Sequence, residues 1–351
     1  MSWNGTPDFS INTSAASGTT NRVITTSNIF VCVVMLITFL FGFVVNSLYL
    51  WVLGFRISKT VNSIWFFHYV LTNLVYTLLL PFIAVYMLFF PDWMMGLAMC
   101  KLLNFSLSVS MFEAVFILTV ISIDRYLLVF HPHWTRRHMK PRKATIICVF
   151  LWGLAFLCSS PYIVLRQLRK ENATTVCFND FSLSGKREEQ QDQEKIKWSL
   201  FTFRVLAGYL LPFFIMSFCY FRIAVKMRKE KLAKSSKPYK VIFIAVLSFF
   251  VCWLPYHMWY GMSVEKGRFQ ETTLRALRIL TVCLACFNFC FTPIFYLFII
   301  ESFRKMFKKS ILSLIESVLN EAFVSVSKSV EDKATPHSSS MVKDESQVHK
   351  N

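Results

Sequence analysis

The chain has 351 residues, of which 55% are hydrophobic and only 17% are charged, and its formal net charge is +18. Soluble domains average about 45–50% apolar and about 25% charged residues, so this composition argues against a soluble globular protein. The positive charge would suit a nucleic-acid-binding protein, but the basic residues are segregated into alternate loops, which argues for a role in membrane topology instead.

Seven long apolar stretches predict seven membrane-spanning helices, at 28–55, 62–90, 98–128, 143–166, 197–226, 238–262 and 273–300. Each is longer than the roughly 20 residues that cross a hydrocarbon core of about 30 Å. The predicted fold class is therefore an all-α membrane protein, built as a seven-transmembrane-helix bundle.

Charge and glycosylation signals predict how the bundle is oriented. Residues 1–27 are polar, and basic residues gather after the first, third, fifth and seventh stretches, for example at 136–143 and 226–240. This positive-inside bias places the N-terminus outside the cell and the C-terminus in the cytosol of a multi-pass plasma-membrane protein. Glycosylation sequons begin at Asn4, Asn12 and Asn172, all on the predicted outer side.

The segment after the last span has two parts. Residues 301–322 alternate apolar with charged side chains at helical spacing, which predicts an amphipathic helix on the inner membrane surface, in contact with lipid headgroups. Residues 323–351 are rich in Ser, Lys and acidic residues, so we expect a disordered cytoplasmic tail whose phosphorylation recruits an arrestin-like partner. The predicted organisation is thus 1–27, 28–300, 301–322 and 323–351.

The cysteines and histidines point to a structural role rather than to catalysis or metal binding. Of ten cysteines, only Cys100 and Cys177 are predicted to be extracellular, where a disulfide persists. The other eight lie within predicted spans, where cysteine packs as a small hydrophobic residue. Because no catalytic constellation or metal-ligand spacing is present, we expect no enzyme, no metal site and no cofactor.

Short motifs follow one another in a fixed order along the spans. A charged pair closing the third span, Asp124 and Arg125, is costly in lipid and indicates a functional position at the water boundary. The remaining motifs are Asn46, Tyr126 after the charged pair, Trp152, Pro212 with Tyr220, Trp253 with Pro255, and Thr292 with Pro293 and Tyr296. In this arrangement the chain resembles the rhodopsin-type (class A) G-protein-coupled receptors over about 28–322.

Within that class the chain is similar to the chemoattractant branch, which contains the formyl-peptide and anaphylatoxin receptors. The similar features are Leu-Pro-Phe at 80–82, Leu-Pro-Phe-Phe at 211–214 and the charged Arg204. The resemblance implies a receptor for an extracellular peptide or anionic ligand that signals through a heterotrimeric G protein of the inhibitory class. The alternatives are a non-signalling decoy or scavenger of the same fold, and a transporter, for which the sequence shows no inverted repeat.

Arg204 is the predicted ligand-binding residue. It lies eight residues before Pro212, about 12 Å along the helix toward the outside. An arginine inside a span needs a partner, and the resemblance implies an anionic ligand group; the alternative is an internal ion pair with Glu113. Residues expected to line the same cavity are Leu107, Ser108, Met111, Tyr256, His257, Tyr260 and Arg278.

The resemblance also implies a switch and an activation core. Asp124 would hold Arg125 until it is released toward Tyr220, with Tyr126 and Tyr296 completing the G-protein switch; the alternative is an interfacial arginine that only snorkels to water. No acid occurs at 234–236, so we expect a weak resting lock. The expected core comprises Asn46, Asn73, Trp253, Pro255, Asn288, Thr292 and Pro293. Asn73 stands where relatives have the aspartate of a sodium site, so we expect no sodium effect.

Overall fold

The computed structural model of the chain describes residues 25–171, 174–182, 190–230 and 237–299, with short helical pieces at 312–313, 315–317 and 319–321. The three sequon asparagines, Asn4, Asn12 and Asn172, lie outside the described residues, as does the tail at 323–351. Most of the predicted surface helix at 301–322 also lies outside them.

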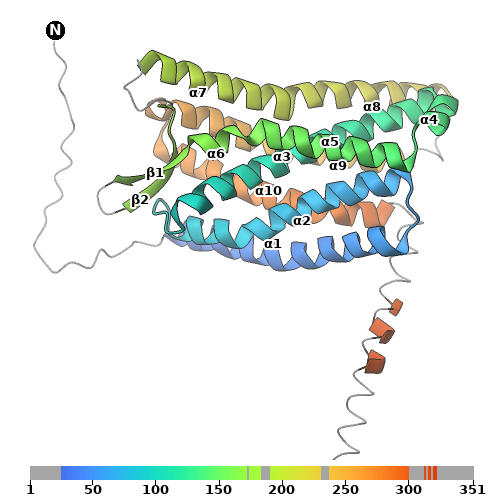
Figure 1. Cartoon of the computed structure of the whole chain (residues 1–351), viewed down its shortest axis with the longest axis horizontal. Helices are drawn as coiled ribbons and strands as arrows, with labels where there is room; N and C mark the ends of the chain where they lie inside the picture. The colour runs from blue at the N-terminus through green and yellow to red at the C-terminus, as the bar shows by residue number, and fades with distance from the viewer. Residues whose placement is uncertain are drawn as a thin grey trace, which may run out of the picture.

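Seven long helical rods run side by side through the described part of the chain (Figure 1). They are α1 with the π-helical turn η1 (Thr26–Trp51, Val52–Arg56), α2 (Val61–Leu88), α3 (Gly96–Phe130), α5 with α6 (Pro141–Ser159, Pro161–Leu165), α7 with the π-helical turn η2 and α8 (Gln190–Val205, Leu206–Leu210, Leu211–Lys229), α9 (Lys237–Val264) and α10 (Glu271–Ile299). Six of these described segments are long and apolar enough to cross a membrane. The seven rods match the seven predicted spans within a few residues, except at the start of the fifth rod.

Helix α3 forms the centre of the bundle. It packs against α2, α5, α8 and α9. Of the residues in its most apolar stretch, 67% are buried, compared with 17% in the α1 rod and 22% in the α5–α6 rod. The outer rods instead turn large apolar side chains outward, including Ile37, Leu40, Phe150 and Phe221. Apolar groups on both the inside and the outside suit a bundle that lipid surrounds, because lipid tails are as apolar as the core.

The fifth rod is longer than the sequence predicts. Its helix is described from Gln190, about two turns before the expected start at 197, and the rod of 40 residues reaches about 60 Å. The π-helical turn η2 interrupts it directly before Pro212. Such turns occur where a helix is locally widened, often at functional sites, and here the turn begins two residues after Arg204.

A β-hairpin covers one end of the bundle, which we call the hairpin end; the opposite end, where α4 (Pro132–His138) lies, is the Arg125 end (Figure 1). The strands β1 (Arg166–Glu171) and β2 (Thr174–Asn179) pair antiparallel, with Leu168 opposite Cys177. The sequence predicts only a polar loop here. The prediction missed the strands because β1 is mostly charged and pairs only once β2 is fixed beside it.

Two connections hold the hairpin over the bundle. The predicted disulfide between Cys100 and Cys177 is present, with the two Cα atoms 5.9 Å apart. The backbone N–H of Trp93 donates to the carbonyl of Thr175 at 2.6 Å, and the N–H of Thr175 donates to Asp92 Oδ1 at 2.9 Å. The start of α3 and the α2–α3 loop therefore fix the second strand together.

Removing the disulfide tests this anchoring. The Cys100→Ser/Cys177→Ser variant opens a covalent loop of 77 residues, so we expect a loss on the order of 2–5 kcal/mol in stability. Thermal melting of the purified protein measures it, and Cys32→Ser, a free cysteine on α1, is the control. An unchanged melting temperature in the double variant would show that the hairpin is held without the disulfide.

Candidate functional site

Arg204 lies in the last turn of α7 and points into the bundle, where only 6% of its surface is exposed. The turn η2 follows it and brings the rod close to α3. Gly208 in that turn is buried, and a Cβ added to it would lie only 3.0 Å from Met111 Cε. The absence of a side chain at Gly208 thus permits the close approach that seats Arg204 against α3.

The guanidinium of Arg204 is held by neutral groups. Nη1 donates hydrogen bonds to Ser108 Oγ at 3.1 Å and to Tyr162 Oη at 2.6 Å, while Nη2 lies 3.4 Å from Met111 Sδ. Ser108 in turn accepts a hydrogen bond from Ser159 on α5 at 3.0 Å. Four aromatic rings surround the cation with their centroids 5.1–5.7 Å from Cζ, and they belong to Phe112, Tyr162, Tyr256 and Tyr260.

The alternative of an internal ion pair between Arg204 and Glu113 is wrong in this structure. Glu113 is fully buried, but neither carboxylate oxygen has a hydrogen-bond partner among the described residues, and no ion pair joins it to Arg204. Helical spacing gives the reason. Glu113 follows Met111 by two residues and so points about 200° away around α3. The cation therefore keeps an uncompensated charge within the described part of the chain.

The other predicted cavity residues divide into three groups: four touch Arg204, one packs against one of these four, and two do not touch it. Ser108, Met111, Tyr256 and Tyr260 contact Arg204 directly. His257 is buried beside Tyr256, with ring centroids 5.2 Å apart. The remaining two do not contact Arg204: Leu107 belongs to the surrounding apolar packing, and Arg278 stacks over the ring of Phe90 at 3.7 Å.

Sequence reasoning missed Tyr162 and Arg166. Tyr162, in the short helix α6 that begins at Pro161, accepts the shortest hydrogen bond from Arg204, and no sequence pattern marks it. Arg166 opens β1 with its Cζ 5.8 Å from the ring of Tyr162, and its Nε is buried without a partner. Arg204 was marked because it lies inside an apolar run, whereas Arg166 directly follows one and so lacked that signal.

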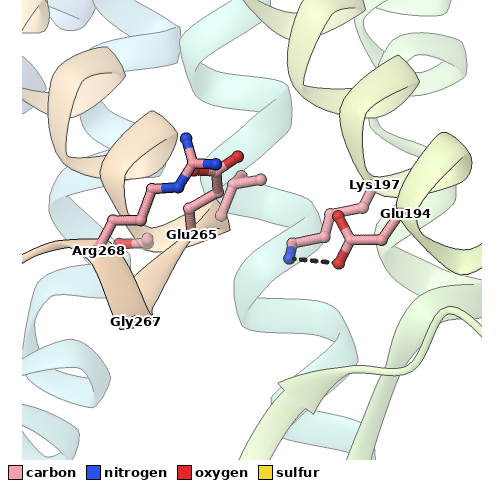
Figure 2. A pocket seen from close by; sticks show the side chains of 7 residues that line it. Glu194, Lys197, Glu265, Gly267 and Arg268 are labelled. Atoms are coloured by element: carbon pink, nitrogen blue, oxygen red, sulfur yellow. Dashed lines mark hydrogen bonds and ion pairs between the residues drawn. The ribbon is translucent and has the colours of Figure 1, made fainter. Parts of the chain in front are cut away.

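Two hollows lie at the hairpin end. A small cavity borders Arg204 and is lined by residues including Tyr162, Asn179 and Tyr260. A wider groove of about 490 Å³ lies between α7 and α9 at the hairpin end (Figure 2). Its charges are already paired, Lys197 with Glu194 at 3.2 Å and Arg268 with Glu265 at 2.8 Å. The groove therefore lacks the uncompensated charge that distinguishes the Arg204 cavity.

A run of aromatic contacts connects the Arg204 cavity with the middle of the bundle. Tyr256 lies against Trp253 with centroids 5.4 Å apart, and Trp253 contacts Phe289 at 5.9 Å. Phe289 stacks on Tyr76 at 3.8 Å. A displacement of Tyr256 by a bound group would thus be transmitted through ring packing to α10 and α2, because close-packed interiors pass on strain. Pro255 lies inside α9, in the chain between Trp253 and Tyr256, and its side chain is buried.

Below these rings lies a polar core without charge. Asn46, Asn73 and Asn288 are buried to 1% exposure or less. Asn46 donates to the carbonyl of Gly42 at 2.8 Å, while neither side-chain polar atom of Asn73 has a partner among the described residues. The side chains of Thr292 and Pro293, also predicted for this core, lie outside the described residues, as does that of Tyr296. The described core thus offers amides but no carboxylate.

The predicted switch lies at the Arg125 end, 14 residues beyond Met111 on the same helix. Arg125 Nη2 is 3.3 Å from Asp124 Oδ2, and both side chains are largely buried. Tyr220 on α8 lies with its hydroxyl 3.4 Å from Ser122 Oγ, which donates to it. The ring of Tyr126 faces α8 and stacks on Phe130 at 4.6 Å. The structure thus brings Asp124, Arg125, Tyr126 and Tyr220 to one end of α3.

Comparison with known proteins agrees with this geometry. Residues 45–296 match the family described as 7 transmembrane receptor (rhodopsin family). The chain is 41% identical to probable G-protein coupled receptor 33 of Homo sapiens over 319 residues, which cover 90% of this chain and 95% of that protein. It is 41% identical to the Mus musculus protein of the same name, covering 82% and 85%. It is 35% identical to chemerin-like receptor 1 of Sus scrofa, covering 84% and 83%.

The uncharged core predicts indifference to sodium, since a sodium ion requires anionic or several hard oxygen ligands. We expect the wild-type protein to melt at the same temperature in sodium chloride and in choline chloride of equal concentration. Asn73→Asp should create a sodium-dependent rise of a few degrees, measured by thermal melting, and Asn104→Asp should not. A sodium-dependent melting temperature in the wild type would contradict the prediction.

Proposed function

The chain belongs to the rhodopsin family of seven-transmembrane receptors, and on that premise we propose that it recognises an extracellular ligand through an anionic group bound at Arg204. A receptor of this family is a multi-pass plasma-membrane protein that couples a ligand to a G protein and is not an enzyme. The alternative of a transporter is therefore set aside.

The observation that carries this proposal is the buried, uncompensated charge of Arg204. Ser108 and Tyr162 satisfy some of its N–H groups, and the rings attract the cation, but a neutral oxygen does not neutralise it. A buried charge without a counter-charge is costly, and a charge at membrane depth marks a functional site by default. An entering carboxylate would supply the missing counter-charge.

Two further arginines extend the positive potential at the hairpin end. Arg166 and Arg278 both lie within electrostatic reach of Tyr86, and neither forms an ion pair within the described part of the chain. A cavity of one sign with apolar walls concentrates ligands of the opposite sign. A peptide C-terminal carboxylate fits this chemistry. One relative is named chemerin-like receptor 1, so a ligand of the chemerin class is the first to test.

The Arg125 end supplies the surface for a G protein, which we expect to be of the inhibitory class. Basic residues of α4 and of the last turn of α8 gather there, including Arg136, Arg137, Lys226, Arg228 and Lys229 (Figure 1). Orientation with this end in the cytosol follows the positive-inside bias. The same basic surface suits acidic lipid headgroups and an arrestin-like protein recruited by the phosphorylated tail.

A decoy or scavenger receptor is the second candidate, and the polar core favours it. Asn73 replaces the charge that would couple the ligand cavity to the switch, and its side chain has no partner among the described residues. A ligand could then bind at Arg204 without moving α3 and α8. Binding and signalling must therefore be measured separately.

Replacing Arg204 tests the ligand site. Arg204→Ala should lower the potency of a carboxylate ligand about 10- to 150-fold, the range for a lost hydrogen bond to a charged group. Surface expression should stay unchanged, because no buried carboxylate is left unpaired. Peptides of the chemerin class in free-carboxylate and C-terminal amide forms serve as probes, and Lys195→Ala on the outer turns of α7 is the control. Equal ligand potency in the wild type and in Arg204→Ala would contradict the proposal.

Ligand-free activity separates a signalling receptor from a decoy. Wild-type receptor in membranes should stimulate nucleotide exchange on a purified inhibitory-class G protein, and Arg125→Ala should abolish the stimulation because the switch cation is gone. A silent wild type that still binds ligand through Arg204 would favour the decoy.

A further inference from the structure

A contact between α2 and α3 that the sequence did not predict holds Arg125 in place. Arg125 Nη2 donates a hydrogen bond to Asn62 Oδ1, and Nε has no partner. Asn62 is exposed in the first turn of α2. The only carboxylate paired with Arg125 among the described residues is its chain neighbour Asp124. The guanidinium is therefore shared between an acid on its own helix and an amide on the next one.

The position of Asn62 is fixed by the start of its helix. Thr60 and Ser63 form a capping box around it, in which the N–H of Ser63 donates to Thr60 Oγ1 at 3.1 Å and the N–H of Thr60 donates to Ser63 Oγ at 2.8 Å. Ser63 Oγ also donates to the carbonyl of Ser58 at 3.1 Å. A capping box orders the first turn of a helix. The amide is thus presented to Arg125 from an ordered support.

Asp124 alone does not fix the direction of the Arg125 guanidinium. Adjacent residues on a helix do not face each other, so the contact between Asp124 and Arg125 leaves the direction of the guanidinium open. Asn62 sets that direction by drawing it toward α2. Tyr220 approaches α3 from α8, where its hydroxyl meets Ser122 three residues before Arg125. The cation thus has one neighbour on the α2 side and another on the α8 side.

We propose that Asn62 is a positioning residue that retains Arg125 in the resting receptor and must release it before Arg125 reaches Tyr220 and the G protein. This rests on the proposed function, in which Arg125 is the switch. The stretch 234–236 contains no acid and lies outside the described residues. Asn62 retains Arg125 only weakly, because an amide oxygen binds a guanidinium less strongly than a carboxylate does.

Two substitutions at one position should have opposite effects. Asn62→Ala removes the acceptor and should raise ligand-free nucleotide exchange by up to about 10- to 150-fold, the range for one hydrogen bond to a charged group. Asn62→Asp provides a carboxylate and should lower exchange below the wild-type level. Thr145→Ala, at an exposed threonine whose hydroxyl bonds only within α5, should leave it unchanged. A merely structural role would not give opposite signs, so equal exchange in all variants, or a rise with Asn62→Asp, overturns the proposal.

A silent receptor would count against the proposed function, and a melting experiment then decides on Asn62. Asn62→Ala, Arg125→Ala and the double variant are melted in the same detergent. If the two residues act as one pair, the double variant melts close to the lower single variant; additive shifts show independent residues and overturn the proposal. Failure of G-protein coupling and failure of the Asn62 contact are thus distinguished by different measurements.

Discussion

Helix α3 is enclosed by other elements along most of its length, so any group that it carries must find its partners inside the protein. The helix presents Ser108 and Met111 to Arg204 near one end and Arg125 to α2 and α8 near the other. From Met111 to Arg125 is 14 residues, or about 21 Å. A rigid, buried helix with a functional group at each end can report a change at one end to the other, provided that a second packing arrangement exists.

Both arginines of functional interest have neutral partners on the neighbouring helices. Arg204 contacts hydroxyls, a thioether and aromatic rings, and Arg125 contacts an amide in addition to its adjacent carboxylate. A carboxylate from another helix would bind either cation more tightly. Neutral partners leave each cation available to a stronger acceptor that arrives later. At Arg204 that acceptor is the ligand of the proposed function, and at Arg125 the arriving group is the G protein.

Ring packing and buried amides fill the space between the two ends of the bundle. Aromatic contacts lead from Tyr256 through Trp253 and Phe289 to Tyr76, and they end above a core of amides. A carboxylate with a bound cation would tie several helices at that level by strong ionic contacts. Asn73 offers only hydrogen bonds, which are shorter in range and weaker. The described residues therefore connect the two ends by packed rings rather than by ions.

The sequence alone determined the seven spans, the disulfide and the order of the motifs, because these depend on local hydropathy, on chain position and on the side of the membrane. It also marked Arg204 and Arg125, since a charge within an apolar run is visible without coordinates. Only the tertiary structure decided what each arginine touches. Glu113 was a reasonable partner for Arg204 by depth, but its direction around α3 points it elsewhere. Tyr162 and Asn62 were not marked by any pattern, because their proximity arises from the packing of α6 and α2 against α3. Partners that come from separate helices are set by how the helices rotate and cross, and that information is not contained in any single stretch of the chain.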